Sequence, residues 1–492
     1  MDADGKHNTV LPRSISVVKM FSRMEESDKE LAMKNADQLA ELEEQLNSFD
    51  PAERQQALKR LAEGKHPHPP EGTNVNMHFH SFFSYNAEGY SPSRIAWEAH
   101  KAGLYAAGLC DFDVIDGLEE FMQAGLSLGL RTTVNLETRA YVKEFANVDI
   151  NSPGEQGVTY VMGAGFAREL PKGSFQEKGL AGYRARACAR NIALIERINA
   201  RLPDIAIDYE KDVLPLTPTG SATERHIISA YLNKSKAVFQ HPDATVEFWT
   251  KIIGQPFLET AMLFADTPSF EEVVRSKLVK RGGIGYEAPS PSTFPPIDEF
   301  TKWVASCEAV PMLTWLDGTS GGEKDSKAFL ECMKSNGAVA INLIPDRNWN
   351  IANPEQRAVK IAKLNEIVKI ADSMDMPINI GTEMNKLGLP FVDDLDKGAL
   401  KPHKESFLRG ARIMIGHSLL LRYAGMSYIS AKANSEFAAP KAKNAFFEAV
   451  GRLPAMDSNR AKELEDTGQD KALAWFHDKV KSETDRGCCK GE

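Results

Sequence analysis

Cysteine is scarce in this 492-residue chain, and no long apolar run is present. The six cysteines are too few and too irregularly spaced for a disulfide scaffold, and such sparse use is typical of a reducing compartment. No apolar run approaches the roughly 20 residues that span a bilayer. The residues after Met1 also lack a basic segment followed by an apolar one. We therefore expect a cytoplasmic protein with no membrane association.

Excess positive charge is also absent. The chain has 59 Lys and Arg against 68 Asp and Glu, which gives a formal net charge of −9. Binding to duplex nucleic acid favours a strongly basic face, so we expect no nucleic-acid partner. The Gly-rich segment 317–322 lacks the Lys-Ser/Thr ending of a phosphate-binding loop. The expected partner is a small-molecule substrate, and the composition carries no signal for an oligomeric state.

A pair of histidines ends the first strand-like segment of the chain. From Val75 to His80, apolar residues alternate with Asn76, His78 and His80. A period of two places both imidazoles on one face of a strand. Two neutral imidazoles in that position can converge on one divalent cation. A His-x-His pair has low specificity by itself, so its context decides the interpretation.

The central part of the chain alternates between strand-like and helix-like patterns. Seven short apolar segments predict strands at Val75–His80, Ala106–Phe112, Thr132–Val142, Thr159–Gly163, Pro311–Trp315, Ala338–Ile344 and Pro377–Thr382. Helical patterns lie between most of them, which predicts a parallel sheet with helices outside. Short strands that are apolar on both faces favour closure into an α/β barrel.

Helical segments flank the predicted barrel. Residues 1–73 predict a helical N-terminal extension that ends in a Pro-rich linker, and residues 74–400 predict the barrel. The strand and helix alternation breaks at about 234–300, which predicts a helical insertion. Residues 401–492 predict a helical C-terminal segment with a disordered tail.

Polar residues occur where the predicted strands end. Asp111 and Asp113 follow the second strand, Glu137 lies on the third, and Glu383 follows the last. The carboxyl ends of barrel strands carry the chemistry in this class of fold. Polar side chains there are costly unless they are paired or bound to metal. For Asp111 and Asp113, a role as helix N-caps remains an equal alternative.

Several motifs in this order resemble the polymerase and histidinol phosphatase (PHP) family of metal-dependent phosphoesterases. They are His78-Phe79-His80-Ser81, Cys110-Asp111-Phe112-Asp113, Glu137, and Gly381-Thr382-Glu383-Met384-Asn385. The similarity is good over 75–140 and continues in the right order to about 395. The resemblance implies a distorted (β/α)7 TIM-like barrel that holds up to three metal ions.

The resemblance also implies which metal ligands this chain keeps. One ion would be held by His78, His80, Glu137 and Glu383, the last with Glu in place of the Asp of the family. Other ligand positions of the family correspond to residues that bind metals poorly or not at all: Tyr85, Phe112, Tyr160, Trp315 and Asn385. We therefore expect one divalent ion, with Mn, Zn and Fe all compatible with these ligands.

Three further residues are candidates for catalysis. Asp111 or Asp113 could act as a base or as the hydrogen-bond partner of a ligand histidine. His226 follows Arg225 at the start of a helical segment and could bind an anionic substrate group, as could Arg347. Simple surface exposure is the alternative for these last two.

The predicted function is that of a PHP-type, phosphoesterase-like hydrolase with a reduced, mononuclear metal site and a small soluble substrate. One ion in a barrel can also support isomerase or lyase chemistry on a carbonyl or sugar-type substrate. A third possibility is a binding protein that kept the fold without turnover.

Overall fold

The computed structural model describes residues 26–64, 66–290 and 293–488. The chain divides into two compact units, Met1–His66 and Pro67–Glu492. The metal-ligand candidates and the whole β-sheet belong to the second unit. The expected N-terminal extension therefore corresponds in large part to the first unit.

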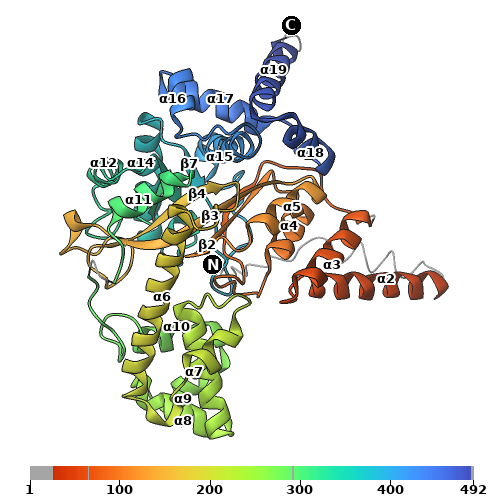
Figure 1. The fold of residues 1–492 in the computed structure, drawn as a ribbon. Helices are drawn as coiled ribbons and strands as arrows, with labels where there is room; N and C mark the ends of the chain where they lie inside the picture. Colours follow the sequence, from red (N-terminus) through yellow and green to blue (C-terminus); the bar gives the residue numbers. More distant parts are fainter. Residues whose placement is uncertain (1–25, 65, 291–292, 489–492) are drawn as a thin grey trace, which may run out of the picture. The chain divides into compact units, whose positions relative to one another are not determined.

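Two helices make up the described part of the first unit. They are α2 (Glu26–Gln45) and α3 (Pro51–Glu63), which contact each other (Figure 1). Asp50 caps α3, because its carboxylate accepts the N–H of Ala52 and Pro51 occupies the first turn, where a missing N–H costs nothing.

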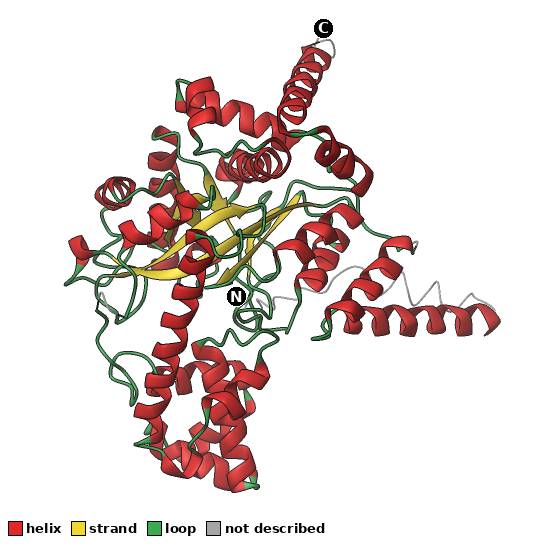
Figure 2. Cartoon of the chain, in the orientation of Figure 1, coloured by secondary structure: helices red, strands yellow, loops and turns green. Residues whose placement is uncertain are grey.

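A seven-stranded sheet forms the centre of the second unit (Figure 2). The strands are β1 (Val75–Phe79), β2 (Ala106–Phe112), β3 (Arg131–Tyr141), β4 (Val158–Phe166), β5 (Val310–Trp315), β6 (Ala340–Leu343) and β7 (Ile378–Ile380), and they pair in sequence order. Just after β7, Glu383 forms a parallel bridge with Phe79 of β1. The sheet is therefore a nearly closed barrel, and all seven predicted strands are present.

One strand runs against the predicted direction. The sequence predicted a parallel sheet, but β4 is antiparallel to both β3 and β5. Residues 142–157, between β3 and β4, contain only the 3-10 turn η1 (Lys143–Phe145). A parallel return usually runs through a helix, and this connection contains none, so it suits an antiparallel return.

Polar pairs and a glycine close the barrel between its first and last strands. The Asn76 side-chain amide donates to Thr382 Oγ1 at 2.7 Å, and the Asn379 amide donates to the Met77 carbonyl at 3.2 Å. A Cβ on Gly381 would lie 2.4 Å from the Cβ of His78. Only glycine allows this close approach, which brings the chain after β7 against the histidine strand.

Helices cover the outside of the barrel. They are α4 (Pro92–Lys101), α5 (Leu118–Leu128), α11 (Ile297–Ser306), α12 (Ser326–Ser335) and α14 (Pro354–Ser373), and the short α13 (Asp346–Trp349) follows β6 and contacts α14. Their amphipathic pattern explains their position, since α4 buries Ile95, Trp97 and Ala99 while its charged residues remain partly exposed.

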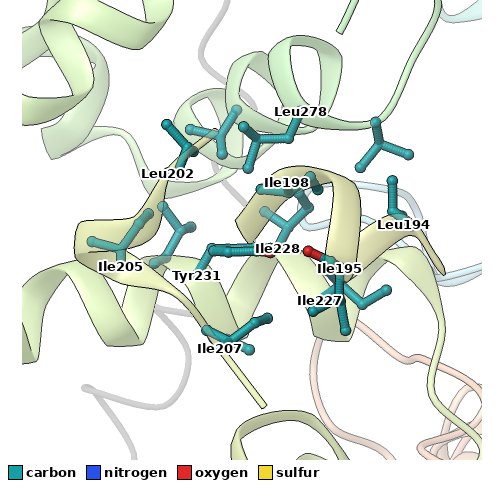
Figure 3. Packing of buried hydrophobic residues seen from close by; sticks show 14 of the residues in the cluster. Leu194, Ile195, Ile198, Leu202, Ile205, Ile207, Ile227, Ile228, Tyr231 and Leu278 are labelled. Carbon is teal, nitrogen blue, oxygen red and sulfur yellow. Dashed lines mark hydrogen bonds between the residues drawn. The ribbon is translucent and has the colours of Figure 1, made fainter. Parts of the chain in front are cut away.

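A helical insertion separates β4 from β5. It begins with α6 (Phe175–Asn199), earlier in the chain than the 234–300 expected from the sequence. It continues through η2 (Pro203–Ile205), η3 (Tyr209–Val213), η4 (Leu214–Leu216), α7 (Glu224–Phe239), α8 (Pro242–Ile253), α9 (Phe257–Ala265) and α10 (Thr267–Leu278). Figure 3 shows its own apolar core, in which Ile198, Ile228 and Leu278 pack together. In Figure 1, α6 runs from the sheet into this cluster.

The C-terminal helices pack on the barrel and on one another. They are α15 (Lys404–Ala424), α16 (Ala431–Glu436), α17 (Pro440–Arg452), α18 (Ser458–Thr467) and α19 (Gln469–Cys488), with the short turn η5 (Lys401–His403) before them. Residues 489–492 of the expected tail lie outside the described residues. Within the described segments, no helix combines the length and the apolar character needed to cross a membrane.

One buried histidine of α15 fastens this helix to β4. The His417 Nε2 lies 3.0 Å from the carbonyl oxygen of Gly165, and the N–H of Tyr428 donates to its Nδ1 at 3.0 Å. Both ring nitrogens of His417 therefore have partners. A Cβ on Gly165 would lie 2.2 Å from the His417 ring, so this contact needs glycine.

Candidate metal centre

Three of the four predicted metal ligands meet at the mouth of the barrel. His78 and His80 come from β1 and the residue after it, and Glu137 comes from β3, two strands away. Glu137 Oε2 lies 3.6 Å from His78 Nε2 and 3.5 Å from His80 Nε2. The three side chains are 0 to 1% exposed, and one ligand atom of each lies within 4.8 Å of the others. We call these residues the His-His-Glu triad.

The atoms of the triad fit a metal ion better than they fit one another. His78 Nε2, His80 Nε2 and Glu137 Oε2 are buried and have no hydrogen-bond partner. Their separations are too long for hydrogen bonds, yet ligand atoms on a tetrahedral ion lie about 3.4 Å apart. Burial and the neighbouring His78 lower the pKa of His80 to about 3. At His78, burial is outweighed by Cys110 and Glu137, which raise its pKa. Both imidazoles must be neutral to hold an ion.

The fourth predicted ligand, Glu383, has a different partner. Its backbone lies between the two histidines, because its N–H donates to the His78 carbonyl and its own carbonyl accepts the N–H of His80. Its side chain accepts a hydrogen bond from Arg347 at 2.8 Å. Burial opposes ionisation of Glu383, but Arg347, His78 and His80 outweigh it and hold the pKa at about 2. Ligation by Glu383 therefore stays a prediction.

Asp111 lies behind the triad and organises the turn after β1. Its carboxylate accepts the N–H and hydroxyl of Ser81, both at 2.7 Å, and the hydroxyl of Ser84 at 2.6 Å. The Ser84 hydroxyl also lies 3.3 Å from Nδ1 of His80. Burial raises the pKa of Asp111 to about 6, although the serine hydrogen bonds act in the opposite direction. Asp111 therefore reaches His80 through the Ser84 hydroxyl, and its role as partner of a ligand histidine stays a prediction.

Asp113, predicted as a base or as the partner of a ligand histidine, lines the cavity beside the triad. Its backbone is left-handed, with φ of 58°, and its N–H donates to the carbonyl of Glu137. This unusual conformation turns the chain at the end of β2. The Thr138 hydroxyl donates to the carboxylate at 2.5 Å. Burial raises the pKa of Asp113, while Arg190 and Thr138 lower it.

His226 lies at the start of α7, where it takes part in a helix cap. The Thr223 N–H donates to its Nδ1 at 3.1 Å, and its ring packs edge-on against Tyr85 at 5.1 Å. His226 is buried and is not part of the cavity lining, whereas its neighbour Arg225 is. Its catalytic role remains a prediction.

Aromatic side chains occupy the surroundings of the triad. Phe112 stacks on His80, with ring centres 4.7 Å apart and an interplanar angle of 12°. Phe112, Tyr85, Tyr160 and Asn385 line the cavity, while Trp315 is fully buried. No other group of three His, Cys, Asp or Glu side chains among the described residues could hold an ion by the same distances.

A cavity of about 540 Å³ opens beside the triad. Its wall includes Glu383, Phe112 and Arg347, and it extends to α6, α7 and α10 of the insertion. The cationic lining residues are Arg139, Arg184, Arg190, Arg225, Arg275, Lys280 and Arg347. Of these, the sequence indicated only Arg347, because the others are spread over β3, α6, α7, α10 and the residues just after α10 and form no local motif.

Comparison with known proteins finds solved structures that are similar to this chain, among them the two named below. No family model and no curated protein matches the sequence. A proposed metal-dependent phosphoesterase from Bifidobacterium adolescentis is 19% identical, with a TM-score of 0.43 over 69% of this chain and 98% of that one. An amidohydrolase from Chromobacterium violaceum, with bound sulfate and no metal, is 12% identical, with a TM-score of 0.45 over 68% of this chain and 96% of that one. Both scores are below 0.5, so we base no inference on them.

Proposed function

We propose that this protein is a metal-dependent hydrolase of the PHP type, with one divalent ion bound by the His-His-Glu triad. The observation that carries the proposal is the convergence of three buried ligand atoms without hydrogen-bond partners. A buried polar atom left without a partner costs about 1–3 kcal/mol, so three at one point favour a bound cation. Mn, Zn and Fe all suit two imidazoles and a carboxylate.

The surrounding side chains support a single ion rather than a cluster. Phe112 covers one face of His80, and Arg347 holds the carboxylate of Glu383. A fixed guanidinium at that place disfavours a second cation nearby, because the two positive charges would repel each other.

The residues around the ion have separate tasks in the proposed reaction. In such a site a divalent ion supplies Lewis-acid polarisation of a phosphoryl or carbonyl oxygen and lowers the pKa of water. Asp113 lines the cavity and can accept or deliver the proton. Arg347 faces the same cavity and can hold an anionic group of a small substrate once it leaves Glu383.

Elemental analysis of the purified protein tests the proposal. We expect about one equivalent of Mn, Zn or Fe per chain, and loss of that metal in His78→Ala and in His80→Ala. The control is His241→Ala, which removes an exposed histidine. A folded protein without metal, or His78→Ala with full metal content, would show the proposal to be wrong.

A further inference from the structure

The cavity beside the triad has a charge opposite to that of the whole chain. Seven cationic side chains line it against four acidic ones, Asp113, Glu224, Glu272 and Glu383, although the chain carries a formal charge of −9. Glu224 pairs with Arg139, Arg275 and Lys280. Glu272 pairs with Arg225, and Glu383 pairs with Arg347. Most of the cations are therefore neutralised in place.

Arg190 of α6 is the exception among these cations. It makes no ion pair within 4.0 Å with any described carboxylate. Its guanidinium donates to the Thr293 carbonyl at 2.9 Å and lies 4.7 Å from the ring centre of Phe294. Arg190 and Asp113 attract each other electrostatically, but without a direct contact. One guanidinium of the cavity wall thus has most of its donors available.

Arg139 of β3 lies against the same aromatic ring. Its guanidinium is 4.8 Å from the ring centre of Phe294, and it pairs with Glu155 at 2.7 Å. Burial and the charge of Arg139 lower the pKa of Arg190 to about 10. Arg139 already pairs with two carboxylates, Glu155 at 2.7 Å and Glu224 at 3.0 Å. Of these two guanidiniums, Arg190 is therefore the one whose charge is left for an anion.

We propose that Arg190 provides an oxyanion subsite, beside the carboxylate-paired Arg139, that binds a second anionic group of the substrate, a phosphate or a carboxylate, away from the reacting bond. Planar guanidiniums bind either group through paired N–H donors. Because Arg190 comes from the helical insertion and not from the barrel, the subsite would select substrates by the group that lies farthest from the reacting bond. This inference rests on the proposed function, since it concerns the substrate of the same cavity.

Calorimetric titration with inorganic phosphate and with succinate, at constant ionic strength, tests the subsite. The protein is used as purified, with its metal content measured. We expect at least one of the two anions to bind, with affinity at least tenfold weaker in Arg190→Gln and intermediate in Arg190→Lys, which keeps the charge but loses the planar fork. The anion that binds more tightly indicates whether the subsite recognises a phosphate or a carboxylate. The matched control is Lys178→Gln, an exposed charge on the same helix, which should stay within about twofold of the unchanged protein.

A second variant separates the subsite from the metal. His78→Ala should lose metal but keep anion affinity within about threefold. No binding of either anion, equal affinity in Arg190→Gln and the unchanged protein, or loss of binding in His78→Ala would each overturn the subsite. Absence of metal in the unchanged protein would instead overturn the proposed function. If Arg190→Gln melts at a much lower temperature, Arg190→Lys gives the comparison.

Discussion

Histidines are buried both in the barrel and in α15, which packs on the barrel, and the ring nitrogens have opposite surroundings in the two places. His78, His80 and His417 are all 0% exposed. Both nitrogens of His417 have backbone partners, whereas Nε2 of each triad histidine has none. Burial alone therefore does not separate a structural histidine from a ligand histidine, but the hydrogen-bond partners do. The two regions should respond differently to metal and to pH.

The largest expected effect is the loss of stability when the metal is removed, and this loss should depend on the triad and not on His417. With free ion at a thousand times its dissociation constant, bound metal stabilises the folded state by about 4 kcal/mol. We expect a chelator to lower the free energy of unfolding by about this amount, as measured by urea denaturation. In His78→Ala the chelator should have no effect. A chelator effect of equal size in that variant would place the metal elsewhere.

The second largest expected effect is the loss of stability at low pH that comes from protonation of His417. Burial lowers the pKa of His417 to about 4, below the unfolded value of about 6.5, so the unfolded state takes up the proton first. The stabilisation is complete above pH 6.5 and is lost as the pH falls towards 4, by about 3 kcal/mol in total. Urea denaturation between pH 7 and pH 4.5 should show this decrease, and His417→Gln should lack that part of it. Identical pH slopes for both proteins would contradict the assignment.

The smallest expected effect is on metal affinity, and it comes from the hydrogen bonds that Asp111 accepts behind His80. Asp111→Asn weakens the acceptor for Ser81 and Ser84 and so loosens the orientation of the His80 ring. Loss of such a partner typically weakens metal binding about tenfold, or about 1.4 kcal/mol. Competition with a chromophoric chelator measures it, with the exposed Asp298→Asn as control. Unchanged affinity in Asp111→Asn would show that the network serves the fold alone.

The strands and the His78–His80 pair could be predicted because their signals are local, whereas Glu137 was predicted as a ligand from the resemblance to the PHP family. Apolar alternation marks β1 and β3, and a polar residue at a strand end indicates the mouth of a barrel before any contact is known. The direction of β4 was predicted wrongly. Its signal was present in residues 142–157, which carry no helical pattern of the kind that a parallel crossover usually contains.

Other parts of the site depend on contacts that no local pattern encodes. The carboxylate of Glu383 turns to Arg347 because of a side-chain contact across 36 residues. Arg139 and Arg190 meet at Phe294, which lies about a hundred residues further along the chain than Arg190. In a single sequence these arginines look like any exposed cations, so the sequence did not reveal the basic cavity.

The closure between β7 and β1 also links the two ends of the barrel sequence to the triad. Asn76 joins Thr382, and the backbone of Glu383 joins both His78 and His80. If β7 separated from β1, the imidazoles would move, so an ion that fixes the imidazoles opposes this separation. By thermodynamic reciprocity, the contact between β7 and β1 strengthens ion binding by the same free energy by which the bound ion stabilises that contact. An ion bound by the His-His-Glu triad, whose residues come from the first and third strands, would therefore also stabilise the position of the last strand.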